Sequence, residues 1–260
     1  MADQHAFLRG PYPRAFAHRG WHVGELAGME NSLSAFRRAV AEGYRYVETD
    51  VHATADGVVV VQHDAVLDRT TDRGGAVAAQ RWSVVRRARI AGREEVCRLE
   101  EVLEELPEAL FNIDVKSDAA VEPVVRVLRR MRCVDRVCLA SFSEARLARL
   151  RRLVGPGLLT SLGPRSVGVL WAAARCPVVP VRALVGGRLA QVPVRRGRLT
   201  VVDRRLVRVA HGRGLEVHVW TVDGERRMRE LLDLGVDGLV TDRPEVLRAV
   251  LRDRGVWRAG

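Results

Sequence analysis

Two histidines and three acidic residues in the first half of the chain are of the types that metal-dependent phosphodiester chemistry requires. They are His18, His63, Glu48, Asp50 and Asp114. Histidine titrates near neutrality and can take up or release a proton during a reaction. A set of carboxylate oxygens favours magnesium or calcium over zinc as the bound ion. The sequence therefore predicts one divalent cation, Mg²⁺ or Ca²⁺, beside a pair of acid–base histidines.

The residues around Glu48 alternate between polar and apolar as a β-strand does. Side chains two residues apart on a strand point to the same face, so Glu48, Asp50 and His52 share one face. The two carboxylates then form an oxygen-rich pocket. His52 lies further along the strand, and we expect it at the rim or behind the ligands rather than among them.

A turn signal, Asp56-Gly57, follows this strand and precedes an apolar run at 58–61. Together they predict a β-hairpin. If Asp56 and Gly57 form a two-residue loop, counting outward pairs Asp50 with His63. Side chains paired in this way have Cβ atoms about 4.5–5.5 Å apart, so the hairpin would return His63 to the carboxylates. A longer or bulged turn would shift this register.

Six short motifs run through this region in a fixed order. They are His18-Arg19-Gly20, Glu30-Asn31, Glu48-Thr49-Asp50, Thr54-Ala55-Asp56-Gly57, His63-Asp64 and Arg69-Thr70-Thr71. This ordered set resembles the glycerophosphodiester phosphodiesterase family of the phospholipase C-like barrel superfamily. Weaker similarities at 98–103, 112–116, 219–223, 235–238 and 241–244 extend the resemblance over almost the whole chain.

The resemblance implies a phosphoric diester hydrolase that releases sn-glycerol 3-phosphate and an alcohol from a small glycerophosphodiester. His18 and His63 would divide the acid and base roles, in an order that the sequence does not assign. Arg19 and Lys116 would bind the phosphate oxygens. Trp220 would line the alcohol pocket, or would only fill the barrel core. By the same resemblance, the substrate's own hydroxyl attacks first and water then opens a cyclic phosphate.

The sequence departs from the family pattern at Asp114, where the family generally has Glu, and at Met29, where it has Pro. An Asp in the first position also resembles sphingomyelinase D and phospholipase D-like toxins of the same superfamily. A lysophospholipase D or sphingomyelinase D-like reaction that forms a cyclic phosphate is therefore an alternative. Such a reaction calls for an apolar groove, and the Arg-rich segment before residue 98 offers little apolar surface beyond Trp82.

At several other positions a structural role is an alternative to a catalytic one. Glu30 either acts in the site or anchors its loop, and Asp64 is expected to orient His63 rather than to touch substrate. We expect no catalytic part for the remaining histidines, His5, His22, His211 and His218.

Apolar runs alternate with amphipathic segments along the chain. Strands are expected at 15–18, 46–51, 110–115, 137–142, 158–162, within 189–194, and at 216–220 and 238–241. Helices are expected at 32–42, with Asn31 as N-cap, and at 99–106, 119–131, 144–153, 167–175, 203–211, 225–234 and 244–253. This pattern predicts an α/β fold, a single (β/α)8 TIM barrel over residues 1–260, with a hairpin and small insertion at about 54–98 after strand two.

Active sites of such barrels lie at the C-terminal ends of the strands. The residues that fall at or just past these predicted ends are His18, Asp50, Asp114, Lys116, Trp220 and Asp242. Since the strands were assigned from apolar runs, this coincidence supports the site independently of the motifs.

The composition is strongly basic, with 43 Lys and Arg and a formal net charge of +11. Lys116 is the single lysine among them, which hints at a site that needs a compact ammonium group. The arginines could attract a peripheral anionic membrane, whereas we expect no nucleic-acid partner. A non-enzymatic module binding such surfaces is a third alternative, but binding alone needs no histidines around an acid cluster.

No apolar run of about 18 residues predicts a membrane span, and no secretory signal is visible at the N-terminus. We expect a cytoplasmic protein. The four cysteines, Cys97, Cys133, Cys138 and Cys176, lack Cys-x-x-Cys spacing and are expected as buried reduced thiols.

Overall fold

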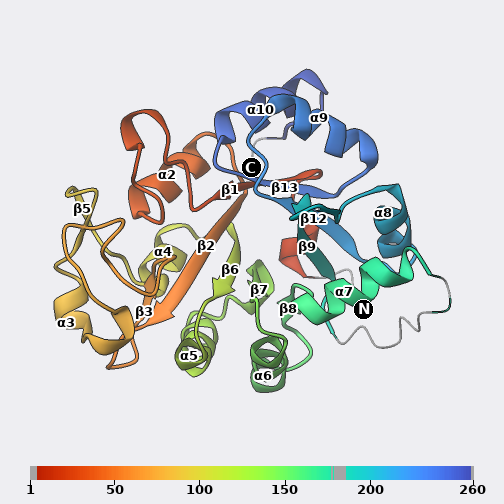
Figure 1. Ribbon diagram of the computed structural model, residues 1–260. Coiled ribbons are helices and arrows are strands. Elements are labelled where there is room, and N and C mark those ends of the chain that lie inside the picture. Colours follow the sequence, from red (N-terminus) through yellow and green to blue (C-terminus); the bar gives the residue numbers. More distant parts are fainter. Residues whose placement is uncertain (1–4, 177, 179–185, 259–260) are drawn as a thin grey trace.

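Eight parallel strands form a nearly closed barrel with helices around it (Figure 1). The computed structural model describes residues 5–176, 178 and 186–258. The strands follow the order β8-β7-β6-β2-β1-β13-β12-β9, and a parallel bridge between Ser161 and Leu189 joins the two ends. The predicted TIM barrel is therefore confirmed.

The barrel strands occupy nearly the positions that the apolar runs predict. They are β1 Arg14–His18, β2 Tyr46–Ala53, β6 Leu110–Val115, β7 Val137–Ala140, β8 Leu159–Thr160, β9 Leu189–Pro193, β12 Glu216–Trp220 and β13 Gly238–Thr241. β2 and β6 are buried along their full length, as expected for parallel strands covered on both faces. β7 ends at Ala140, so Ser141 and Phe142 lie in the loop that follows rather than in the strand.

The helices of the outer layer also follow the sequence pattern. They are α2 Leu33–Ala41, α4 Leu99–Glu105, α5 Val121–Met131, α6 Glu144–Val154, α7 Pro164–Ala173, α8 Arg204–His211, α9 Glu225–Leu234 and α10 Pro244–Asp253. α7 begins three residues before its predicted start because Pro164 occupies a first-turn position, where its missing N–H costs nothing. A short 3₁₀ turn, η3 (Asp118–Ala120), precedes α5.

The predicted N-cap of the first barrel helix is wrong by one residue. Ser32 caps α2, because its side chain accepts a hydrogen bond from the backbone N–H of Ala35. Asn31 instead has a left-handed backbone, with φ +60°. Its side chain is thereby free to point into the barrel mouth.

The predicted hairpin exists, but its register differs by one residue. β3 (Val59–Val61) pairs antiparallel with β2 so that Val51 faces Val61. Gln62, and not His63, therefore stands opposite Asp50, and its N–H donates to the Asp50 carbonyl. The turn is longer than two residues, because the backbone groups of Thr54 and Val58 pair across a three-residue loop.

The insertion after this hairpin has its own small core, to the left in Figure 1. It contains the short elements η2 Val77–Ala79, α3 Trp82–Val85, β4 Arg89–Ile90 and β5 Glu94–Glu95. Leu67, Val77, Val85 and Ile90 are fully buried within it. The arginines predicted for this segment lie outside that core.

The remaining described elements are short, and three of the four cysteines follow the prediction. The elements are α1 Ala6–Arg9, η1 Gly24–Leu26, η4 Val134–Arg136, β10 Arg195–Arg196 and β11 Leu199–Thr200. Cys97, Cys133 and Cys138 are buried free thiols. Cys176 is exposed, so the prediction of burial is wrong there, because it lies just past α7 on the outer layer. None of the described helices is both long and apolar enough to cross a membrane.

Candidate active site

The C-terminal ends of the strands surround a pocket of about 170 Å³. All eight predicted site residues line it: His18, Arg19, Glu48, Asp50, His63, Asp114, Lys116 and Trp220. Asn112 and Gln191 also line the pocket, and the Gln191 amide donates to Asn112 at 2.9 Å across the barrel interior. The predicted site residues are therefore brought together at the barrel mouth.

Strand register explains why these side chains meet. Parallel pairing puts His18 on β1 beside Glu48 on β2, and Asp50 on β2 beside Asp114 on β6. Because Glu48 and Asp50 are two residues apart, both point into the barrel. Each of the three carboxylate residues is less than a tenth exposed.

Burial and mutual repulsion set the charge state of this carboxylate group. Burial, and then the neighbouring Asp50 carboxylate, raise the pKa of Glu48 to about 8. Burial also raises the pKa of Asp114. Asp50 behaves differently, because the charges of Lys116 and Arg19 outweigh its burial and lower its pKa. Groups packed this closely need added positive charge if all are to be ionised.

Two cations already lie against the carboxylates. The Lys116 Nζ is 2.7 Å from an oxygen of Asp50 and 2.7 Å from an oxygen of Asp114. The Arg19 guanidinium is 3.2 Å from Asp50 and 2.9 Å from Glu30. Despite burial, the two carboxylates raise the pKa of Lys116, so it is held in the charged form.

His18 is held by a carboxylate from the far end of the chain. Its Nδ1 lies 2.6 Å from Asp242, just past β13, and its Nε2 lies 3.6 Å from Glu48. An ionised carboxylate can only accept, so Nδ1–H donates to Asp242 and Nε2 faces Glu48. His22 shares the same Asp242 oxygen at 3.1 Å. Burial lowers the pKa of His18, but Glu48 and Asp242 outweigh it and raise that pKa.

His63 has a matching arrangement on the loop after β3. Its Nδ1 donates to Asp64 at 2.6 Å, and Arg69 binds both Asp64 and Glu30. Glu30 thereby ties the His63 loop to Arg19. The backbone carbonyl of His63 lies 3.2 Å from the ring of His52, so His52 supports this loop from behind.

Comparison with known proteins identifies the family of this chain. A model of the glycerophosphoryl diester phosphodiesterase family matches residues 18–246. The "Probable glycerophosphodiester phosphodiesterase 2" of Mycobacterium tuberculosis is 39% identical over 254 residues, covering 96% of this chain and 95% of that protein. This chain belongs to the glycerophosphoryl diester phosphodiesterase family. It is accordingly a phosphodiesterase.

Solved structures share the fold of this phosphodiesterase. A Silicibacter pomeroyi protein named for the same activity is 28% identical, with a TM-score of 0.78 over 94% of this chain and 95% of that one. A phosphodiesterase from Oleispira antarctica, solved with the product sn-glycerol-3-phosphate, is 20% identical, with a TM-score of 0.77 over 93% and 97% of the two chains. The second similarity concerns the fold alone.

The carboxylates of the phosphodiesterase suit a hard cation, although in the described residues no group of three or more His, Cys, Asp or Glu converges tightly enough to hold one. Lys116 bridges Asp50 and Asp114 in this arrangement. One buried oxygen, Oδ1 of Asp114, has no hydrogen-bond partner at all. A buried carboxylate oxygen without a partner is costly, so this atom is the clearest opening for a ligand.

A second, larger cavity adjoins this candidate active-site pocket. It has a volume of about 770 Å³ and shares Asp114, Phe142 and Trp220 with the first. The rings of Phe142 and Trp220 meet edge to face with centroids 5.6 Å apart. Phe142 is 67% exposed. The apolar residues lining the rest of this groove are Leu162, Pro164, Val167, Pro193 and Val201.

The sequence did not predict three contacts around the pocket, Asp242 with His18, His22 with Asp242 and Asn31 with Asp50, or the exposed ring of Phe142 beside Trp220. Asp242 fell at a strand end, which was a signal, but nothing local tied it to His18. Asn31 donates from its amide to Asp50 at 3.1 Å and accepts from Thr49 at 2.8 Å. Its place in the Glu-Asn motif could have suggested such a bridge.

Proposed function

We propose that this phosphodiesterase hydrolyses small glycerophosphodiesters to sn-glycerol 3-phosphate and an alcohol, with one divalent cation and two histidines. The supporting observation is the pocket in which two carboxylate-held histidines, His18 and His63, stand beside three buried carboxylates. The product bound to the Oleispira antarctica protein is consistent with this substrate class.

Glu48, Asp50 and Asp114 are the proposed ligands of the cation. Their donor atoms are all oxygens, which suits Mg²⁺ or Ca²⁺. The unpartnered Oδ1 of Asp114 supports its place in this set. When bound, the cation supplies positive charge that offsets the negative phosphate oxygens.

Arg19 and Lys116 are the proposed phosphate-binding residues. Both are cations of the pocket wall, and each now contacts a carboxylate that it could exchange for a phosphate oxygen. A guanidinium binds two oxygens at once, whereas an ammonium acts as a compact point charge. Trp220, beside them, would pack against the alcohol group of the substrate.

His18 and His63 would divide the proton transfers. One histidine removes the proton from the attacking hydroxyl, and the other protonates the alkoxide as the bond from phosphorus to the leaving oxygen breaks. Because Asp242 and Asp64 hold the Nδ1 atoms, each Nε2 is the nitrogen available for this work. If the substrate's own hydroxyl attacks, a cyclic phosphate forms and water opens it in a second step with the roles exchanged: the histidine that gave up its proton takes one from water, and the other protonates the substrate oxygen as the ring P–O bond breaks.

The first experiment is an assay of the chelator-stripped, full-length protein. Glycerophosphocholine, glycerophosphoethanolamine and lysophosphatidylcholine are each incubated with Mg²⁺, Ca²⁺ or neither, and products are followed by phosphorus NMR. Metal-dependent release of glycerol 3-phosphate is the expected result. Turnover that is unaffected by chelation and metal return would contradict the cation, and inactivity on all three diesters would contradict the substrate class.

A matched pair of variants tests the histidines. His18→Ala and His63→Ala should each lose at least about 100-fold in kcat, the usual scale of general acid–base catalysis. His211→Ala is the control, because His211 lies on the outer layer and pairs with Asp237. Full activity in either of the first two variants would remove that histidine from the mechanism.

The apolar groove favours a second candidate substrate, a lysophospholipid. The insertion after β3 was expected to offer little apolar surface beyond Trp82, but the groove lies away from that insertion, between the loops after β7, β8 and β9. A single acyl chain could occupy it while the phosphate sits among the carboxylates. Turnover of lysophosphatidylcholine alone, or to a cyclic phosphate, would favour this candidate. Cytoplasmic location and contact with an anionic membrane both stay predictions.

A further inference from the structure

A short basic hairpin stands beside the opening of the active site. It is formed by β10 (Arg195–Arg196) and β11 (Leu199–Thr200), which pair antiparallel. Gly197 and Arg198 make the turn, and Gly197 has φ +58°, a conformation that glycine readily supplies to two-residue hairpin loops. Because the hairpin follows β9 closely, it leaves the barrel at the end where the catalytic pocket opens.

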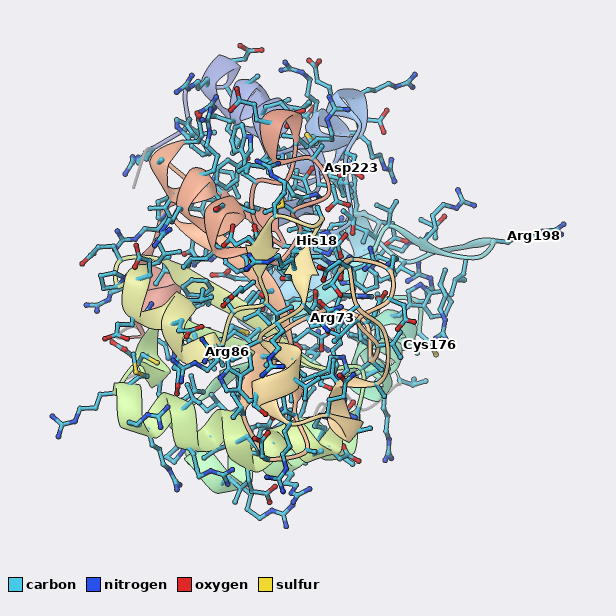
Figure 2. All side chains as sticks on the ribbon, turned by 90° about the vertical axis from the view of Figure 1, so that its left-hand side faces the viewer. His18, Arg73, Arg86, Cys176, Arg198 and Asp223 are labelled. Carbon is cyan, nitrogen blue, oxygen red and sulfur yellow. The ribbon has the colours of Figure 1, made fainter. Side chains whose placement is uncertain are left out.

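The hairpin is anchored at its base and free at its tip. The Trp171 indole N–H donates to the Thr200 carbonyl at 3.1 Å. Arg175 lies over the Trp171 ring at 3.9 Å and pairs with Asp203 at 2.6 Å. All residues from 195 to 200 are exposed. Figure 2 shows the hairpin extending outward from the rest of the molecule, with Arg198 at its end.

The hairpin arginines have no carboxylate partner among the residues that the structure describes. Within the described ranges, no ion pair includes Arg195, Arg196 or Arg198. The carboxylates in the cleft beside the hairpin, Asp203 and Glu230, are paired with other arginines. The tip therefore presents three cations whose charge is not neutralised within the part of the chain that the structure describes.

Apolar side chains accompany these cations on the same face. Leu199 on the hairpin is 44% exposed, and Phe142 is 67% exposed. Arg195 and Arg196 line the groove whose other end reaches Asp114. The cations, the exposed apolar groups and the entrance to the catalytic pocket thus share one side of the molecule.

We propose that the β10–β11 hairpin docks the protein on an anionic lipid bilayer, so that the active-site mouth faces the membrane. Exposed arginines beside apolar side chains are the combination that anionic lipid surfaces attract. Leu199 lies on the hairpin itself, and an exposed apolar side chain among arginines suits a lipid surface, which offers both anionic headgroups and an apolar interior. The inference concerns binding alone and does not rest on the proposed reaction.

Co-sedimentation of the full-length protein with vesicles tests this proposal without any turnover. Vesicles of phosphatidylcholine alone are compared with vesicles containing one third phosphatidylglycerol, at low and physiological salt. The protein should bind the anionic vesicles more tightly, and added salt should weaken that binding. Equal binding to both vesicle types, or none to either, would overturn the proposal.

Matched triple variants separate the hairpin from the overall charge. Arg195→Gln/Arg196→Gln/Arg198→Gln should lower the partition coefficient on anionic vesicles roughly 10- to 100-fold, given the usual contribution of each basic residue near such a surface. The control replaces three exposed arginines near the C-terminal ends of α5, α8 and α10 by glutamine. They are Arg132, Arg213 and Arg252.

The control removes the same charge but should change the partition less than about threefold. An equal loss in both triple variants would overturn the hairpin's role, as would retention of binding in the hairpin variant. Thermal unfolding establishes that each variant is folded. The single variant Arg198→Gln, at the turn, should still weaken binding several-fold if the triple variant fails to fold.

Discussion

Each candidate catalytic histidine is oriented by one carboxylate. Asp242 holds His18 and Asp64 holds His63, each at 2.6 Å from Nδ1. A hydrogen bond of this kind fixes the tautomer and the plane of the ring. Both carboxylates are ionised. At Asp242, burial raises the pKa, but hydrogen bonds from His18 and His22 outweigh it and lower that pKa. At Asp64, hydrogen bonds from Arg69 and His63 lower the pKa. Residues outside the predicted site therefore govern its chemistry.

Replacing Asp242 by Asn should lower kcat more than it changes KM. The neutral amide can present its NH2 as well as its oxygen to Nδ1, and it carries no charge to stabilise a protonated ring, so a loss of about 10²- to 10⁴-fold in kcat is expected. His22→Ala is the control, because it removes the other partner of the same carboxylate. Steady-state kinetics on glycerophosphocholine would measure both, and a change in KM alone would contradict the orienting role.

Two substitutions at Asp114 test whether this residue is a metal ligand or only a member of an ion-pair network with Lys116. Asp114→Glu should keep metal binding and appreciable activity, since it retains a carboxylate. Asp114→Asn should lose most of both, at least about 100-fold in kcat/KM, because it removes the charge that attracts a cation. Calorimetric titration with Mg²⁺ and Ca²⁺ would be read beside the kinetics. Equal metal affinity in Asp114→Asn and the parent would exclude Asp114 as a ligand.

At the scale of elements, the loop after β1 shows why a glycine follows His18-Arg19. Gly20 has φ +87°, and a Cβ there would lie 2.8 Å from the Ala35 backbone of α2. The loop and the helix therefore pack too closely for any side chain. This contact places Arg19 against Asp50 and leaves His18 facing Glu48.

Gly20→Ala should be much more harmful than Gly24→Ala. Both glycines have positive φ, but nothing lies within 4 Å of a Cβ built at Gly24. The conformational cost alone is about 1 kcal/mol, and the collision with α2 should raise the total at Gly20 to about 2–4 kcal/mol. Urea unfolding would measure both free energies. Equal values would mean that α2 shifts freely away from the loop.

Local sequence signals predicted the hairpin but not its register. The Thr54 hydroxyl donates to Asp56 and accepts from the Val58 N–H, which stabilises a three-residue loop. Gly57, with φ +77°, completes it. The Asp-Gly pair alone could not distinguish this turn from the shorter one, since both use glycine with positive φ.

Across the whole molecule, the barrel and the gathering of the candidate residues at its mouth could be predicted from the sequence, whereas contacts made by barrel closure could not. Alternating apolar runs marked the strands, and the motifs lay at their ends. The partnership of His18 with Asp242 joins residues 224 positions apart, and only the pairing of β1 with β13 brings them together. The apolar groove was missed for the same reason, since loops from three different strands line it.

The base of the barrel depends on a similar long-range contact. Arg14 on β1 binds Glu216 on β12 through two contacts of 2.5 and 2.6 Å. It also donates to the carbonyls of Leu8 and Gly10, and so holds the N-terminal segment across the bottom of the barrel. Although burial opposes it, hydrogen bonds from Arg14 and His218 lower the pKa of Glu216 to about 2.

Glu216 should therefore stabilise the fold at neutral pH and lose this effect in acid. A carboxyl whose pKa is lower in the folded state contributes its full stabilisation above its unfolded pKa of about 4.3 and loses it as the pH falls toward 2. Glu216→Gln should cost about 1–3 kcal/mol at pH 7, and the difference from the parent should shrink by about half at pH 3. Glu95→Gln is the control, because Glu95 forms only an exposed ion pair with Arg89, at 3.6 Å. Its free energy of unfolding should equal that of the parent at pH 7 and at pH 3. Urea unfolding at pH 7 and pH 3 would measure these differences, and a constant cost for Glu216→Gln would mean that packing, not charge, joins the two strands.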